Sequence, residues 1–191
     1  MATHQAIGAT AEAVSRLLAQ SWKPALIPGI TPSFEVYHGK DFATPMAAGI
    51  SVFVYQVGID DVQRTLPPAE PKHKRPLPVR IWLLLTAWAQ DASTEHALLG
   101  WAMRAVADHP ALNSGFLNAA TSGVFRNDET VELSPAALTN DEVFQLWQSL
   151  PGDLQLSMPY LARVLRIEST LVETVGPPVV ERDLDYGVLV P

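Results

Sequence analysis

The stretch Leu77-Pro-Val-Arg-Ile-Trp-Leu-Leu-Leu-Thr-Ala-Trp88 decides how the rest of the chain has to fold. Successive side chains of a β-strand point to opposite faces, and here both faces are apolar. The residues of one face are Val79, Ile81, Leu83 and Leu85, and those of the other are Trp82, Leu84 and Trp88. A strand that is apolar on both sides is typical of the interior of a sheet. We therefore predict a central strand over residues 77–88.

Upstream of this strand, the sequence predicts one helix and two further strands. Residues 4–21 have apolar side chains at the spacing of one helical face, and Lys23-Pro24 ends this helix. Residues 33–38 alternate between the two faces, and residues 50–57 are β-branched or aromatic almost throughout, as in a buried strand. The link 39–49 contains a proline and predicts a hairpin-like loop between these two strands.

Downstream, a second helix is predicted over residues 94–108, with Asp91 or Ser93 as its N-cap. His109-Pro110 ends it. Residues 111–130 are rich in Asn, Ser, Gly and Thr, which predicts a long, mobile loop. A short strand over 131–133 follows.

The third helix has the clearest start signal. Thr139-Asn-Asp-Glu142 is a capping box, in which the Thr139 hydroxyl accepts from the Glu142 amide and the Glu142 carboxylate accepts from the Thr139 amide. Pro151-Gly152 ends the helix. Residues 154–168 then predict a long strand. Proline cannot donate to a β-ladder, so Pro159 predicts a bulge or a sheet edge within it.

The predicted order of elements favours one α+β domain over residues 1–170, with a mostly antiparallel sheet flanked by about three helices. Residues 171–191 predict an extended C-terminal arm. It contains Pro177-Pro178, the acidic run Glu181–Asp185 and the apolar run Tyr186–Val190. Two interpretations of the arm remain open: it adds a strand to another subunit, or it is disordered, as many termini are.

The composition limits the possible functions. The 191 residues include no cysteine, which excludes disulfides, cysteine-based zinc sites and thiol catalysis. The net charge of −7 argues against a general affinity for nucleic acid or anionic membranes. Charged residues make up only 17%, against about 25% in an average soluble protein. This deficit suggests that other protein covers part of the surface.

The charge is also unevenly distributed. Residues 1–90 have eight basic and six acidic side chains, a net of +2, whereas residues 91–191 have five and fourteen, a net of −9. Either neighbouring subunits meet head to tail through opposite charges, or the acids simply gather at helix starts and in the arm.

The sequence offers no catalytic, cofactor-binding or metal-binding motif. No two of the five histidines have the spacing of a metal-binding pair, and neither a nucleophile elbow nor a phosphate-binding glycine loop is present. The most apolar stretch, 81–89, is far shorter than the roughly 20 residues that span a bilayer. Residues 1–10 lack the pattern of a secretory signal. We therefore expect a non-enzymatic, cytoplasmic protein.

Several blocks resemble a known family. They are Leu77-Pro-Val-Arg-Ile-Trp-Leu-Leu-Leu-Thr-Ala-Trp-Ala89, Glu95-His-Ala-Leu-Leu-Gly-Trp-Ala-Met103 with His109-Pro110, Asp141-Glu-Val-Phe-Gln-Leu-Trp147 and Tyr160-Leu-Ala-Arg-Val-Leu-Arg-Ile167. Together they resemble the N-terminal-domain family of the cap, or tube-terminator, proteins of extracellular contractile injection systems. These systems are phage-tail-like particles with an inner tube and a contractile sheath. The similarity is clearest over 77–110 and 140–168.

The resemblance implies a tail-terminator-like α+β fold and a structural role, with no catalytic residues to transfer. The protein would form a homo-hexameric ring on the last layer of the inner tube, end tube growth and anchor the last sheath ring. Its partners would be further copies of itself, the inner tube protein and the sheath protein. The alternatives are a phage head–tail ring adaptor and a soluble enzyme or ligand-binding module with an unrecognised site.

For a ring of this kind, the candidate contact segments are the 60–76 loop, the 111–130 loop and the 176–191 arm. The basic run Lys72–Arg75 either contacts an acidic partner or is a solvated loop. The individual candidate interface residues are Lys72, Lys74, Arg75, Arg126, Asp183, Asp185, Tyr186, Val188 and Val190.

Overall fold

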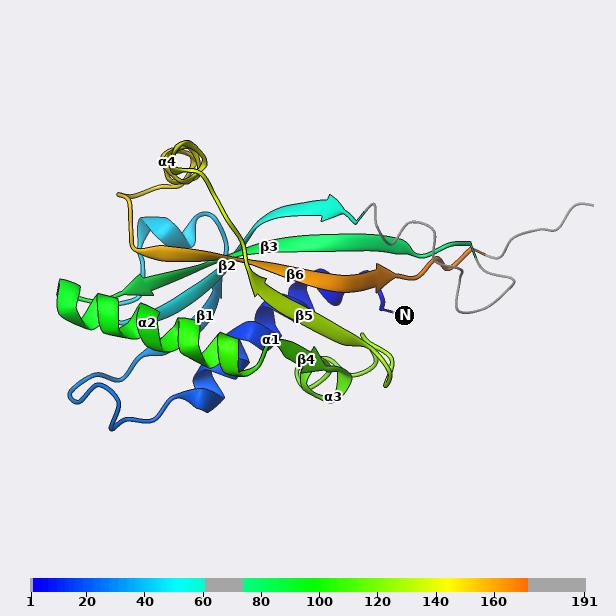
Figure 1. The fold of residues 1–191 in the computed structure, drawn as a ribbon, viewed down its shortest axis with the longest axis horizontal. Helices are drawn as coiled ribbons and strands as arrows, with labels where there is room; N and C mark the ends of the chain where they lie inside the picture. Colours follow the sequence, from blue (N-terminus) through cyan, green and yellow to red (C-terminus); the bar gives the residue numbers. More distant parts are fainter. Residues whose placement is uncertain (1, 61–73, 172–191) are drawn as a thin grey trace, which may run out of the picture.

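The computed structural model describes residues 2–60 and 74–171, which form a curled sheet with helices on both faces (Figure 1). The strands, in the spatial order β1-β2-β3-β6-β5-β4, are β1 (Ser33–Tyr37), β2 (Gly49–Ile59), β3 (Leu77–Trp88), β6 (Ser157–Ile167), β5 (Thr130–Pro135) and β4 (Ala111–Asn113). The helices are α1 (Ala6–Ser21), α2 (Ala92–Asp108), α3 (Ser114–Leu117) and α4 (Asn140–Ser149), with a 3₁₀ turn, η1, over Asp41–Ala43. The predicted α+β class is confirmed.

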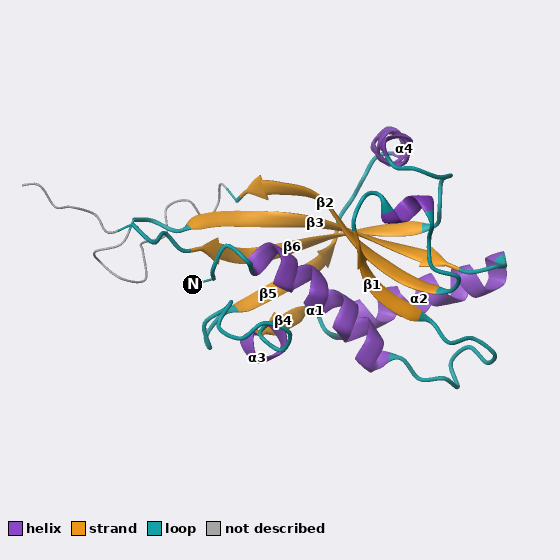
Figure 2. Cartoon of the chain, turned by 180° about the vertical axis from the view of Figure 1, so that it is seen from behind, coloured by secondary structure: helices purple, strands orange, loops and turns teal. Residues whose placement is uncertain are grey.

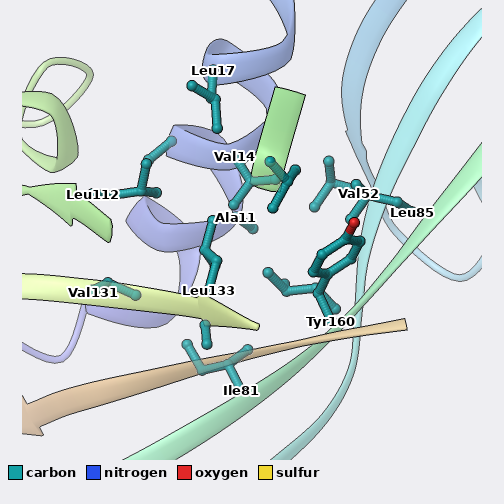
Figure 3. Packing of buried hydrophobic residues seen from close by; sticks show 14 of the residues in the cluster. Ala11, Val14, Leu17, Val52, Ile81, Leu85, Leu112, Val131, Leu133 and Tyr160 are labelled. Carbon is teal, nitrogen blue, oxygen red and sulfur yellow. The ribbon is translucent and has the colours of Figure 1, made fainter. Parts of the chain in front are cut away.

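The central strand is β3, as predicted from its two apolar faces. It pairs antiparallel with β2 on one side and with β6 on the other. One of its faces, which includes Ile81, Leu83 and Leu85, lies in the main core against α1 and α2 (Figure 3). The other face contributes Leu84 and Trp88 to a second core. The two apolar faces predicted for this strand therefore pack into two different cores, one on each side of the sheet.

The second core lies on the opposite face of the sheet and is largely aromatic. Its buried residues are Tyr37, Phe42, Leu84, Trp88 and Trp147. The last of these comes from α4, which lies on the side of the sheet away from α1 and α2 (Figure 2). The rings of Phe42 and Trp147 meet edge to face, with their centroids 5.6 Å apart. Such contacts add to the stability gained from burial alone.

The predicted hairpin between the first two strands is wrong, because β1 and β2 pair parallel, with Ser33 opposite Gly49. The link 38–48 runs back along the sheet through η1 before β2 begins. At its end, the amide of Ser33 donates to the carbonyl of Ala48 at 2.9 Å. Gly49 has φ +146°, and a Cβ atom there would lie 1.9 Å from the Ser33 carbonyl oxygen. The entry into parallel pairing therefore depends on a glycine.

The predicted mobile loop over 111–130 is also wrong, because this segment contains β4 and α3 and is held by asparagine side chains. The amide nitrogen Nδ2 of Asn118 donates to the Phe125 carbonyl, and its Oδ1 accepts from the Phe125 amide, both at 2.8 Å. Asn113 caps α3 by accepting from the Phe116 amide at 2.9 Å. Buried Leu117 and Phe125 anchor the segment to the main core. The polar residues of this segment therefore form hydrogen bonds that order its turns.

The predicted N-terminal signals of α2 and α4 are confirmed. Asp91 is the N-cap of α2 and accepts from the Thr94 amide. Both hydrogen bonds of the capping box between Thr139 and Glu142 are present at the start of α4.

The last strand begins three residues later than predicted, at Ser157. Within it, Pro159 pairs with Leu84 of β3 on one side, and on the other side its carbonyl accepts from the amide of Ala136, just beyond the end of β5. β6 lies between β3 and β5 and has neighbours on both sides at Pro159, so the prediction of a bulge or a sheet edge at this residue is wrong. The bulge lies further on, where Ile81 pairs with Ala162 but Val79 pairs with Leu165.

Candidate assembly surfaces

Among the described residues, a metal ion would need a cluster of ligating side chains, and a small ligand would need a hollow in the surface. No group of three or more metal-ligating side chains lies together in residues 2–60 and 74–171. A surface hollow of about 370 Å³ is lined by Leu17, Gln20, Phe116 and His109, among others. The imidazole Nδ1 of His109 already lies 3.0 Å from the Ala105 carbonyl, at the end of α2. The hollow therefore offers no acid–base pair. In the same residues, no helix has the length and hydropathy needed to cross a membrane.

The shifted pKa values of the described residues do not favour acid–base chemistry at neutral pH. Burial, followed by the nearby charge of Glu142, raises the pKa of Tyr55 to about 12. Burial also raises the pKa of Tyr160. Hydrogen bonds from Thr94 lower the pKa of Asp91. Each of these pKa values moves away from neutrality, whereas a general acid or base at neutral pH needs the opposite.

Three of the predicted contact residues lie at one end of the sheet. Lys74 and Arg75 are exposed just before β3, and the backbone amide of Lys74 donates to the Leu171 carbonyl at 3.2 Å. Arg126 forms an ion pair of 2.7 Å with Glu168, just after β6. Three segments therefore meet at this end of the sheet. They are the basic residues before β3, the 111–130 segment and the residues that follow β6.

The other predicted contact residues lie outside the described part of the chain. They are Lys72, Asp183, Asp185, Tyr186, Val188 and Val190. Most of the 60–76 loop and the whole 176–191 arm lie outside it as well, so these assignments stay predictions.

The same end of the sheet exposes an apolar surface that was not predicted from the sequence. Val57 is 45% exposed, Ile59 40% and Leu77 49%. Val57 and Ile59 pair with Ile81 and Val79 of β3, which are buried in the main core. They therefore lie on the face that α1 and α2 cover elsewhere, and their exposure shows that neither helix covers them. Apolar groups gathered at such a place indicate a protein contact.

The outer edge of β2 is open at this end within the described residues. β1 pairs only with Gly49–Phe53, so β2 continues to Ile59 without a described neighbour on that side. The Asp60 amide donates to the Pro78 carbonyl at 3.0 Å. Because antiparallel pairs alternate in their hydrogen bonding, the backbone groups of Val57 and Ile59 then point to the outer edge. The difference in length between the two predicted strands was the only sequence signal for this edge.

The opposite face of this edge is basic and aromatic. Gly58 pairs with Arg80, and a Cβ atom at Gly58 would lie 3.0 Å from the ring of Trp82. The Arg80 guanidinium lies over that ring, 5.5 Å from its centroid, and its Nη2 donates to the Ile59 carbonyl at 3.0 Å. Because Gly58 has no side chain, the Arg80 side chain can pass over its backbone and reach the edge of β2. Arg163 follows this face on β6, opposite Glu132.

Comparison with known proteins agrees with this architecture. The family model described as the Pvc16 N-terminal domain matches residues 9–181. Among curated proteins, no match is found. One similar solved structure is the sheath/tube terminator of the extracellular contractile injection system PVC in its extended state, with 16% identity and a TM-score of 0.57. Another is the tube-terminating cap of the anti-feeding prophage, AFP, with 19% identity and a TM-score of 0.52.

The matches span nearly all of this chain but only part of the other two. They cover 100% of this chain and 67% of the PVC terminator, and 94% of this chain and 60% of the AFP cap. At these identities the two structures show a shared fold.

Proposed function

The chain belongs to the Pvc16 N-terminal domain family, and from this premise we propose that it caps the inner tube of a contractile injection particle and ends tube growth. The observation that carries the proposal is the shared fold with two proteins that are themselves a sheath/tube terminator and a tube-terminating cap. Catalysis plays no part in this role, in keeping with the absence of a catalytic motif in the sequence.

Within the particle, the protein forms a ring of six copies on the last tube layer. One face of this ring binds the tube, while the other offers no binding site for a further tube ring, so that addition stops. The sheath protein is the second partner, because the last sheath ring needs an anchor at the same height. The chain is made in the cytoplasm and assembled there into the particle.

Two features of the chain support a ring subunit. Charged residues make up only 17% of it, which suits a surface largely covered by other protein. The apolar end of the sheet around Val57, Ile59 and Leu77 is the kind of surface that an assembly buries. A ring also needs two different contact surfaces on each subunit, because head-to-tail contacts close into rings.

Deleting the gene and imaging the particles by electron microscopy tests the role directly. We expect tubes of uncontrolled length and sheaths that detach at one end, and the intact gene supplied in trans should restore a uniform length. Particles of normal length and sheath would contradict the proposal.

Light scattering of the purified protein, alone and with tube rings, provides the biochemical test. We expect six copies for each tube end. A protein that stays monomeric and does not bind tube rings would contradict the cap role.

A further inference from the structure

We propose that the open edge of β2, from Val54 to Ile59, receives the C-terminal residues 183–190 of a neighbouring copy as an added strand. The inference rests on the proposed ring, because it assigns the contact between successive subunits.

Within residues 2–60 and 74–171, no strand pairs with this edge of β2 beyond Phe53. Its sequence Val54-Tyr-Gln-Val-Gly-Ile59 contains no charged residue and no proline. Exposed edges of natural sheets are normally protected by such residues, because unpaired backbone groups otherwise pair with other chains. The backbone groups of Val57 and Ile59 point to this outer edge, where the Ile59 carbonyl also accepts a hydrogen bond from Arg80. An uncharged edge with outward backbone groups is suited to strand addition.

The C-terminal segment has the pattern of a strand with two different faces. Its apolar residues recur at every second position and are Leu184, Tyr186, Val188 and Val190. The alternate positions are Asp183, Asp185, Gly187 and Leu189. A period of two places the apolar set on one side of a strand and the aspartates on the other.

The two faces of the edge match these two sides. On the face that continues the main core, Val57 and Ile59 are 45% and 40% exposed and can pack against Tyr186 and Val188. On the opposite face, the guanidinium of Arg80 reaches the edge at the Ile59 carbonyl, within range of an aspartate on an added strand. A slip of one residue would reverse both faces and lose both contacts. The side of the added strand that faces the main core is therefore specified.

The position of the chain exit favours a neighbouring copy as the donor. The described chain ends at Leu171 beside Lys74, on the β6 side of the sheet end, and β3 separates β6 from the open edge of β2. Donor and acceptor are thus different surfaces of one subunit, which is the arrangement that closes a ring. Fully extended, the 12 residues 172–183 can span at most about 40 Å. The acidic half of the chain would then meet the half with a net charge of +2.

Disulfide trapping tests the contact cleanly, because the chain contains no cysteine. One preparation carries Val57→Cys and a second carries Val188→Cys. The two are mixed, assembled on tube rings and oxidised, and the linked peptides are identified by mass spectrometry. We expect a disulfide between the two different chains. The matched control replaces Val57→Cys with Leu154→Cys, which is similarly exposed but lies near the other end of β3; it should give no link.

The outcomes separate the inference from the proposed function. Assembly on the tube without the Val57–Val188 link would overturn the inference and leave the cap role intact. A link formed only within single chains, in a variant carrying both cysteines, would overturn the assignment to a neighbour. A protein that neither forms rings nor binds tube rings would overturn both.

A charge reversal provides a second test of the same contact, with the yield of the disulfide link as its readout. Asp183→Arg with Asp185→Arg should lower the yield of the link, and adding Arg80→Glu in the acceptor chain should restore part of it. An unchanged yield in the aspartate variants would contradict the proposed contact with Arg80. The melting temperature of each variant confirms that it is folded.

Discussion

The indole nitrogen Nε1 of Trp88 donates a hydrogen bond of 2.9 Å to the hydroxyl of Ser51, inside the pairing of β2 with β3. Ser51 is completely buried and Trp88 nearly so. The bond lets a large aromatic ring enter the second core without leaving its polar atom unpaired. It also places a specific polar contact between the central strand and the strand whose far end forms the open edge.

Replacing Ser51→Ala should lower the free energy of unfolding by about 1–3 kcal/mol, because the Trp88 N–H would then be buried without an acceptor. Chemical denaturation measures this change. In a Trp88→Phe background, which has no such N–H, the same replacement should cost clearly less. An equal cost in both backgrounds would show that the hydrogen bond does not stabilise the pairing.

Replacing Gly49→Ala should destabilise the fold by about 2–4 kcal/mol, because the added Cβ would meet the Ser33 carbonyl at a backbone conformation that L-residues rarely adopt. The matched control is Gly100→Ala in α2, where a Cβ meets nothing within 4 Å. That change should stabilise the helix by up to about 1 kcal/mol. Thermal unfolding of both variants provides the test, and equal melting temperatures would contradict the expected strain at Gly49.

Replacing Asn118→Ala should cost about 2 kcal/mol, because both backbone groups of Phe125 would lose their partner. We expect faster amide hydrogen exchange across residues 118–125 and little change in β3. The control is Asn127→Ala, an exposed asparagine in the same segment. Unchanged exchange in the Asn118 variant would mean that the buried apolar residues alone order this segment.

The sequence predicted best those elements whose signal is contained in one short stretch. The two apolar faces of β3 and the caps at Asp91 and Thr139 are of this kind. Strand direction is different, because the alternation of residues 33–38 is the same in a parallel and in an antiparallel pair. Only the conformation of Gly49 and the path of the link 38–48 decide it.

The order of the 111–130 segment and the open edge of β2 could not be predicted from the sequence for a related reason. The composition of 111–130 resembles that of a loop, but the bonds of Asn118 to Phe125 join residues whose pairing no periodicity encodes. The open edge depends on how far β2 continues past β1, which is a property of the sheet and of neither strand alone. The basic face depends on Gly58 leaving room for Arg80, across two strands.

The two helix starts predict how stability depends on pH. Hydrogen bonds from Thr94 hold the pKa of Asp91 below its ordinary value of 3.8, and bonds from Thr139 hold that of Glu142 below 4.5. A lowered folded-state pKa means that the ionised form stabilises the fold. This contribution is complete above the unfolded-state pKa values and is lost as the pH falls through the folded-state values.

The melting temperature should therefore fall more steeply below about pH 4.5 in the native protein than in a variant with Asp91→Asn and Glu142→Gln. Both replacements keep a side chain that can accept at the cap but cannot ionise. Circular dichroism between pH 7 and pH 2 measures the two curves, and subtracting them removes the contribution of all other acids. Parallel curves would contradict the assignment, because they would mean that neither carboxylate interacts more favourably in the folded state than in the unfolded one.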